Sequence, residues 1–128
     1  MPRSRPQLTP LELQIMKVLW EIGPSSVQAV QEKLSGERLA YTTVQTMLNI
    51  LQRKGKVARK LQGKAYHYRP VLSRERALRD AVGDVLDRMF GGSVEALLMS
   101  LVKSKQLDAK KLDRVQQLIE KYEGGNEE

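Results

Sequence analysis

The spacing of apolar residues changes its period near residue 57, and this change limits the folds open to the chain. Between residues 10 and 54 apolar side chains recur every three or four positions, which is typical of amphipathic helices. From Val57 the period changes to two: Val57, Arg59 and Leu61 alternate with Ala58 and Lys60, and residues 65–69 alternate again, which is typical of strands. Glycine and proline residues divide the helical stretch into three parts. The sequence therefore predicts three helices followed by a β-hairpin.

The start of the first helix is marked by three signals that agree. Thr9 can accept a hydrogen bond as the N-cap, and Glu12 can complete a capping box three residues later. Pro10 occupies the first helical position, where its missing N–H costs nothing. We therefore expect a helix that begins at Pro10 and ends at the Gly23-Pro24 pair.

Two shorter helical segments follow the first. Ser25 or Ser26 can cap the second helix, which Gly36 is expected to end. The third helix begins near Tyr41, is closed by Gly55, and has one apolar face with helical spacing. Its opposite face contains hydroxyls, amides and one guanidinium, without a carboxylate: Thr42, Thr43, Gln45, Thr46, Asn49, Gln52 and Arg53.

The alternating segment predicts a hairpin, because turn residues interrupt it once at Gln62-Gly63-Lys64 and Pro70 ends it. Three helices and a hairpin in this order describe a winged helix-turn-helix. Beyond Pro70 the chain reads as three more amphipathic helices, capped by Ser73, Ser93 and Asp108. The predicted fold class is therefore mainly α, of the α+β type, with a winged helix-turn-helix followed by a three-helix region.

The distribution of charge separates the two parts. The net charge is +7. Residues 1–72 contain 12 Lys and Arg against 4 Asp and Glu, a charge of +8, whereas residues 73–128 contain 10 against 11, a charge of −1. A basic first part suggests an anionic partner such as nucleic acid, although charge alone also fits a solvated basic face without a partner.

The third helix carries the side chains suited to reading DNA. In a helix-turn-helix the second helix of the pair enters the major groove, where amides and hydroxyls can bond base edges. The alternative is a merely polar, solvated face. We assign base readout to Thr42, Thr43, Gln45, Thr46 and Asn49. We assign contacts of the helix end and wing with phosphate to Tyr41, Arg53, Lys54, Lys56, Arg59, Lys60, Lys64 and Tyr66.

The three C-terminal helices are predicted to form a dimer. They are short and Leu-rich, and a core of that size is marginal by itself. They could pack back on the winged helix, but a second copy would bury the same faces in a two-fold interface. The predicted interface residues are Val82, Val85, Leu86, Met89, Phe90, Leu97, Leu98, Leu101, Leu112, Val115, Leu118, Ile119 and Tyr122.

The predicted domains are a DNA-binding domain over residues 1–72 and a dimerisation domain over residues 73–128, with an acidic tail at Glu127-Glu128.

Several classes of protein are excluded by what the sequence lacks. Cysteine is absent and His67 is the single histidine, so thiolate or histidine-cluster metal sites are not expected. There is no paired-carboxylate motif, Gly-rich phosphate loop or nucleophile–base pair at a useful spacing, and we expect no enzyme activity and no cofactor. No apolar run approaches 18 residues and no apolar signal core follows the basic N-terminus, so we expect a cytoplasmic protein without membrane insertion.

Five segments, in their order and spacing, resemble the penicillinase repressor family of BlaI/MecI-like regulators. The resemblance covers roughly residues 8–123. The segments are Leu8–Glu12, Ile15–Trp20, Tyr41–Leu48, Lys54-Gly55 and Tyr66–Pro70.

This resemblance implies a homodimeric transcriptional repressor on a palindromic operator. It further implies relief of repression, linked to antibiotic resistance, when a membrane-bound sensor metalloprotease signals a β-lactam or cell-wall stress and the dimerisation region is cut. The bond cut in the best-known members is Asn-Phe, whereas the aligned pair here is Ser100-Leu101. The copper-responsive branch uses cysteine ligands, which this chain lacks. The alternatives are a winged-helix adaptor that binds protein and not DNA, and a nucleic-acid-processing enzyme.

Overall fold

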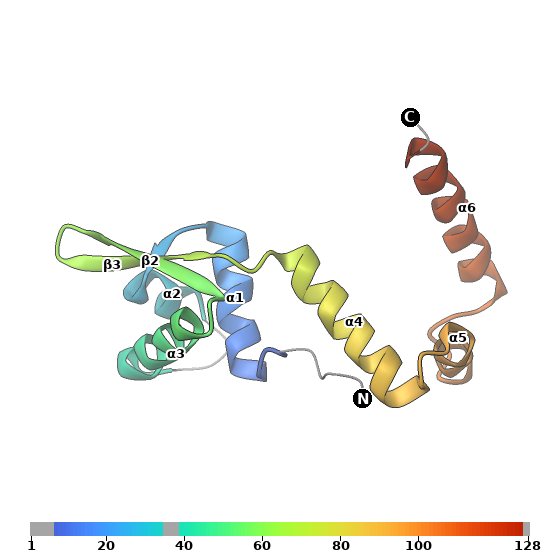
Figure 1. Ribbon diagram of the computed structural model, residues 1–128, viewed down its shortest axis with the longest axis horizontal. Helices are drawn as coiled ribbons and strands as arrows, with labels where there is room; N and C mark the ends of the chain where they lie inside the picture. Colours follow the sequence, from blue (N-terminus) through green and yellow to red (C-terminus); the bar gives the residue numbers. More distant parts are fainter. Residues whose placement is uncertain (1–6, 35–38, 127–128) are drawn as a thin grey trace. The chain divides into compact units, whose positions relative to one another are not determined.

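The computed structural model describes residues 7–34 and 39–126, and Figure 1 shows the order of their elements. Contacts divide the chain into two compact units that meet between Val82 and Gly83, inside a helix. Each unit is described by itself. The predicted acidic tail, Glu127-Glu128, and the predicted helix end at Gly36 lie outside the described residues.

The first unit is a winged helix. Its elements are α1 (Pro10–Ile22), β1 (Ser25–Ser26), α2 (Val27–Lys33), α3 (Tyr41–Arg53), β2 (Val57–Gln62), β3 (Ala65–Pro70) and the first turns of α4 (Arg74–Phe90). The strands form one antiparallel sheet in the order β1-β3-β2, so β3 is the central strand. The mainly α fold class and the winged helix-turn-helix are confirmed.

Local signals explain where α1 begins and ends. The Thr9 hydroxyl accepts from the backbone N–H of Glu12 at 3.2 Å, and the Glu12 carboxylate accepts from the backbone N–H of Thr9 at 2.8 Å. This is the predicted capping box. The helix ends at Gly23, whose φ of +81° favours glycine. Ser26 rather than Ser25 caps α2, by accepting from the backbone N–H of Ala29.

The core of the first unit is formed by the apolar stripes of three helices against the base of the sheet. Tyr68 of the central strand and Val57 of β2 close the core on the sheet side. The buried residues contributed by the helices are Ile15, Met16, Val18, Leu19, Val27, Val30, Leu34, Val44, Leu48 and Leu51. This packing fixes α3 so that its other face points away from the core.

The hairpin β2–β3 forms the wing. Its register pairs Arg59 with Tyr68 and Leu61 with Tyr66. The connection is the two-residue turn Gly63-Lys64. Gly63 has a φ of +64°, a backbone conformation that residues other than glycine rarely adopt. The wing is therefore positioned by the buried Tyr68 at its base and turned by a glycine at its tip.

The remaining helices are α4, α5 (Val94–Lys103) and α6 (Ala109–Asn126). Ser73, Ser93 and Asp108 accept hydrogen bonds from the backbone N–H groups three residues later, as predicted. Helix α6 continues through Gly124 and Gly125 to Asn126. Glycine can adopt helical dihedrals at a cost of about 1 kcal/mol each.

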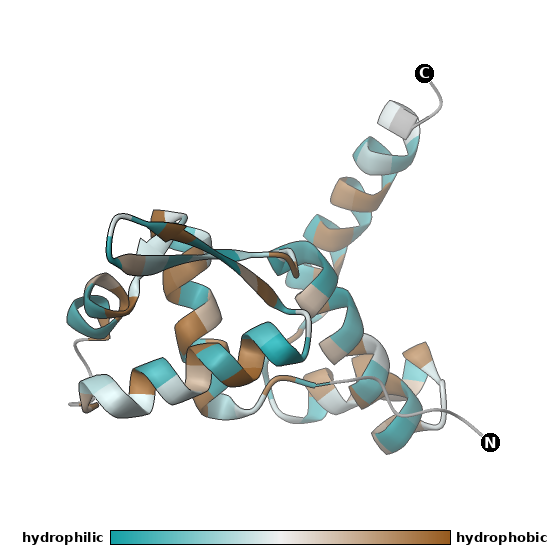
Figure 2. Ribbon diagram, turned by 60° about the vertical axis from the view of Figure 1, so that its left-hand side comes forward, coloured by the Kyte–Doolittle hydropathy of each residue, from teal (hydrophilic) through white to brown (hydrophobic). Residues whose placement is uncertain are grey.

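The apolar faces of these helices are left uncovered within one copy of the chain. Between residues 69 and 125 no residue is buried, and Figure 2 shows hydrophobic residues recurring along α4, α5 and α6. Met89, Leu118 and Tyr122 are 75%, 60% and 70% exposed. Apolar surface of this extent normally marks an interaction site.

Candidate nucleic-acid interface

The outward face of α3 is the centre of the candidate interface. Because Val44, Leu48 and Leu51 are buried, the polar side chains between them face away from the core. Of the residues assigned to base readout, Thr42, Gln45 and Thr46 are exposed, whereas Thr43 and Asn49 are half-buried. The predicted readout residues thus share one helix, but two of them are less accessible than the sequence suggested.

Asn49 is the point where α3 and the wing meet. Its Oδ1 atom accepts from the Tyr68 hydroxyl at 2.9 Å and from the Arg59 guanidinium at 3.1 Å. Arg59 also lies over the Tyr66 ring, 4.3 Å from its centroid, in a cation–π contact. These four residues form what we call the wing clamp, which joins α3 to both strands of the hairpin.

The wing clamp gives Asn49 a structural role that the sequence did not indicate. Bidentate recognition of adenine uses the amide oxygen as an acceptor, and in the free protein this oxygen already serves Tyr68 and Arg59. Base readout by Asn49 therefore competes with the clamp and stays a prediction. The pairing of Arg59 with Tyr68 follows from the hairpin register, but their approach to Asn49 depends on how the sheet packs.

The cations assigned to phosphate lie along the C-terminal end of α3 and the wing. Arg53, Arg59, Lys60 and Lys64 are exposed, and Lys56 is half-buried. The sequence from residue 41 to residue 70 contains no Asp or Glu, so nothing within this segment neutralises them. The exposed Tyr41 and Tyr66 lie on the same two elements. The arrangement suits a polyanion.

A hollow of about 400 Å³ separates the N-terminal end of α3 from the wing strand β3. Gln45 and Tyr66 lie on opposite sides of it, and His67 also lines it. The buried Nδ1 atom of His67 has no hydrogen-bond partner among the described residues. The helix and the wing therefore present two separated surfaces with a polar recess between them.

Lys54 differs from the other predicted phosphate ligands, because its ammonium binds a carboxylate. Its Nζ atom lies 2.8 Å from Oε2 of Glu12, which is only 1% exposed and belongs to α1. Lys54 itself is half-exposed. Glu12 thus caps α1 through one oxygen and holds the end of α3 through the other. Contact of Lys54 with phosphate remains a prediction.

The pKa of Glu12 reflects these opposing effects. Burial raises the pKa of the carboxyl, but the hydrogen bond from Lys54, the two hydrogen bonds with Thr9 and the positive charge of Lys54 together lower it below its ordinary value of 4.5. A lowered pKa in the folded state means that ionised Glu12 stabilises the fold above about pH 4.5. That contribution is lost as the pH falls through the lower pKa of the folded state.

We expect Glu12→Gln to lower the free energy of unfolding at pH 7 by about 1.5–3 kcal/mol, the range for a hydrogen bond to a charged group. Glutamine can keep the capping box but not the ion pair. The loss should shrink as the pH falls below 4.5, because the wild-type carboxyl is then protonated. Urea unfolding at pH 7, 4 and 3 measures this. Glu21→Gln, on an exposed residue of the same helix, is the control, and an equal loss in both variants would contradict the expectation.

The residues predicted for dimerisation lie on α4, α5 and α6, and none is buried. Leu86, Phe90, Leu97 and Leu101 are half-buried, and the others are exposed: Val82, Val85, Met89, Leu98, Leu112, Val115, Leu118, Ile119 and Tyr122. The Ser100-Leu101 bond lies inside α5, two residues before the helix ends. These surfaces have no described partner within one chain.

Two classes of site are not found among residues 7–34 and 39–126. No group of three or more His, Asp or Glu side chains there could hold a metal ion. No described helix is both long and apolar enough to cross a membrane.

Comparison with known proteins gives consistent matches. Residues 8–121 match the family described as penicillinase repressor. The penicillinase repressor of Bacillus licheniformis is 24% identical over 124 residues, 96% of this chain and 97% of that protein. The transcriptional regulator BlaI of Mycobacterium tuberculosis is 32% identical over 123 residues, 94% of this chain and 88% of the relative. The solution structure of the DNA-binding domain of the repressor BlaI matches with a TM-score of 0.50 and 30% identity, over 59% of this chain and 93% of that domain.

Proposed function

The chain belongs to the penicillinase repressor family, and from this premise we propose that it is a transcriptional repressor that binds operator DNA through α3 and the wing. The observation that carries the proposal is the outward face of α3. It presents hydroxyls and amides beside a wing rich in cations, in a segment of 30 residues, 41–70, without a carboxylate.

The chemistry of the two surfaces suggests that α3 contacts the bases and that the wing contacts the phosphates. Thr42, Gln45 and Thr46 are exposed on α3 and can bond base edges or contact a thymine methyl in the major groove. Lys60 and Lys64 near the wing tip can neutralise phosphates or enter the neighbouring minor groove. In this arrangement Arg59 and Tyr66 keep the wing at a fixed distance from the helix.

We further propose that the repressor is a cytoplasmic homodimer. The uncovered apolar faces of α4, α5 and α6 support a second copy as their partner, because no residue between 69 and 125 is buried in one chain. An interface of two identical chains is two-fold symmetric. Two recognition helices related in this way would match an operator that is an inverted repeat.

Relief of repression would follow from loss of the dimer. We propose cleavage within the dimerisation region in response to a membrane-bound sensor metalloprotease, for which Ser100-Leu101 is the aligned bond. That bond lies in a helix, and its cleavage requires local opening of α5 because a protease binds an extended chain.

Operator binding is tested by a mobility shift on the promoter of the chain's own gene, with a scrambled fragment as competitor. We expect Thr46→Ala and Asn49→Ala to lower the preference for the operator over the scrambled fragment. The loss should be about 10- to 100-fold for a bidentate amide contact and smaller for a hydroxyl. Lys60→Ala should weaken both fragments by the same factor, because a phosphate contact carries no sequence information.

Tyr68→Phe is the matched control for Asn49, because it removes only the hydroxyl that binds Asn49 in the wing clamp. If Asn49 reads a base, Tyr68→Phe should keep the preference for the operator. If Asn49→Ala and Tyr68→Phe lower the preference for the operator equally, Asn49 acts only through the wing clamp and does not read a base. No shift of any fragment would favour the alternative function, an adaptor that binds protein instead of DNA.

A further inference from the structure

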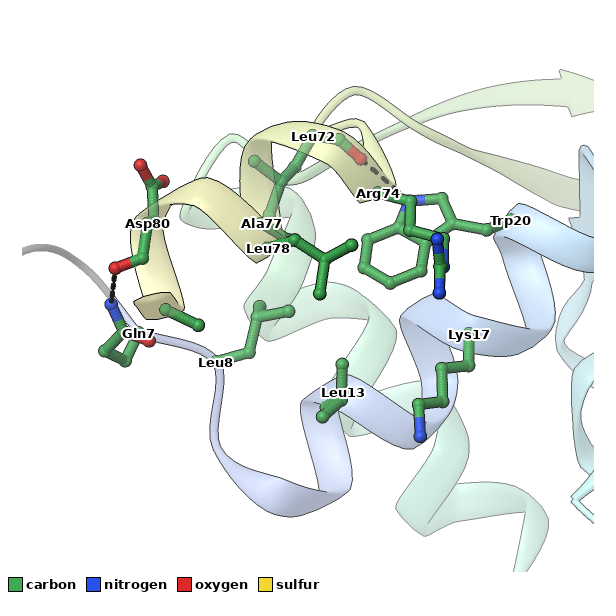
Figure 3. A pocket seen from close by; sticks show the side chains of 11 residues that line it. Gln7, Leu8, Leu13, Lys17, Trp20, Leu72, Arg74, Ala77, Leu78 and Asp80 are labelled. Carbon is green, nitrogen blue, oxygen red and sulfur yellow. Dashed lines mark hydrogen bonds between the residues drawn. The ribbon is translucent and has the colours of Figure 1, made fainter. Parts of the chain in front are cut away.

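A second recess of the winged-helix unit lies away from the candidate interface, between α1 and the first turns of α4 (Figure 3). Its volume is about 350 Å³, at the lower end of the range of small-molecule pockets, about 300–1,000 Å³. Most of its lining is apolar: Leu8, Leu13, Trp20, Leu72, Ala77, Leu78 and Ala81. We call this recess the α1–α4 pocket.

Two hydrogen bonds hold the walls of the pocket together. The indole N–H of Trp20 donates to the backbone carbonyl of Leu72 at 2.9 Å, and the side-chain amide of Gln7 donates to the backbone carbonyl of Asp80 at 3.2 Å. Both join segments far apart in the sequence. The Trp20 ring consequently offers the cavity an apolar surface, since its one polar group is already bonded.

The charged side chains of the pocket are unevenly placed. Figure 3 shows the guanidinium of Arg74 beside the Trp20 ring, the Lys17 side chain extending along α1 away from that ring, and the Asp80 carboxylate pointing away from the cavity. Lys17 and Arg74 are exposed and have no ion-pair partner among the described residues. The pocket therefore combines an apolar floor with two exposed cations at its edge.

No segment of this chain that could occupy the pocket combines an apolar group with a negative charge. The N-terminal residues 1–6 carry Arg3 and Arg5, of the same sign as Lys17 and Arg74. The acidic residues Glu127 and Glu128 bring no apolar group. The residues of a second copy that are predicted to form the dimer interface include no carboxylate, so that interface would not neutralise the two cations. An occupant that satisfies both requirements carries an acid group on a compact apolar body.

We propose that the α1–α4 pocket binds a small organic anion with an aromatic or branched apolar body, whose acid group faces Lys17 and Arg74. Such a ligand would contact both α1 and α4 and so strengthen the packing of residues 74–81. This proposal does not depend on DNA binding, and it adds a site for a small-molecule effector to the proposed repressor.

Two fluorescent probes with the same ring skeleton test the site: 8-anilinonaphthalene-1-sulfonate and the uncharged N-phenyl-1-naphthylamine. The full chain is titrated while the emission of Trp20, the single tryptophan and part of the lining, is recorded. We expect saturable quenching by both probes and tighter binding of the sulfonate. Slower amide exchange in residues 74–81 with bound sulfonate is a second, independent readout.

Variants separate the charge from the apolar floor. Lys17→Gln with Arg74→Gln should weaken binding of the sulfonate about 3- to 10-fold, as expected for two exposed ion pairs, without affecting the neutral probe. Lys103→Gln with Arg114→Gln makes the same charge change outside the pocket lining and should leave both probes unaffected. Leu78→Gln should weaken both probes.

The proposal is overturned if both probes bind equally and the Lys17/Arg74 variant changes neither. It is also overturned if Leu78→Gln leaves the quenching unchanged, since the probes would then bind elsewhere. Tighter binding of the sulfonate after deletion of residues 1–6 would identify the chain's own N-terminus as the occupant and would equally refute it. Operator binding by the same variants, measured without probe, shows separately whether the proposed repressor function holds.

Discussion

Operator affinity is expected to fall about 10³- to 10⁵-fold between about 50 and 200 mM salt, if the dimer makes about 6–10 contacts with phosphate. The physical reason is release of counterions from DNA when cations of the protein replace them. The seven Lys and Arg residues between 41 and 70, with no acid among them, give 14 cations in two copies, which is enough for that number of contacts. Binding isotherms at several salt concentrations give the slope of log K against log[salt].

Single substitutions show how much each residue contributes to the slope of log K against log[salt]. Lys60→Ala removes one phosphate contact from each copy and should reduce the slope by about 1 per copy. Lys54→Ala is expected to reduce it less, because the Lys54 ammonium is already bound to Glu12. Lys110→Ala, outside the basic half, is the control and should leave the slope unchanged. A flat salt response of the wild type would refute the electrostatic part of the proposal.

The sequence predicted the parts of the fold that depend on short-range signals. The capping box of Thr9 and Glu12, the caps of α4, α5 and α6, and the glycine turn of the wing all involve residues within a few positions of one another. The period of apolar residues placed Val44, Leu48 and Leu51 on the buried face of α3. Each of these features depends on local geometry, so it can be predicted from the sequence alone.

Contacts between distant segments were not predictable in the same way. Glu12 was read only as a capping residue, because its ion pair with Lys54 joins positions 42 residues apart. Asn49 was read only as a base contact, because its bonds to Arg59 and Tyr68 depend on how the hairpin packs against α3.

The largest effect on assembly is expected from Ile119→Asp in α6. Ile119 is half-exposed on the apolar stripe shared with Leu112, Val115 and Tyr122. If this stripe packs on a second copy, each substitution buries an unpaired carboxylate, which costs about 3–5 kcal/mol. Two-fold symmetry places two such carboxylates in the interface, so the dissociation constant of the dimer should rise at least ~10³-fold. Sedimentation velocity over a range of protein concentrations measures this change.

The matched control for Ile119→Asp is Gln117→Asp, which adds the same charge to an exposed position of α6 outside the apolar stripe. It should leave the dimer intact. Ile119→Asp should also abolish the gain in affinity of a full inverted repeat over a half-site while keeping half-site binding, because the core of the winged helix lies within residues 15–68. If the wild type is a monomer at all concentrations, the apolar faces of α4–α6 pack back on the same chain. A monomer would give no structural reason to expect an operator that is an inverted repeat, whereas the proposed base contacts of α3 would be unaffected.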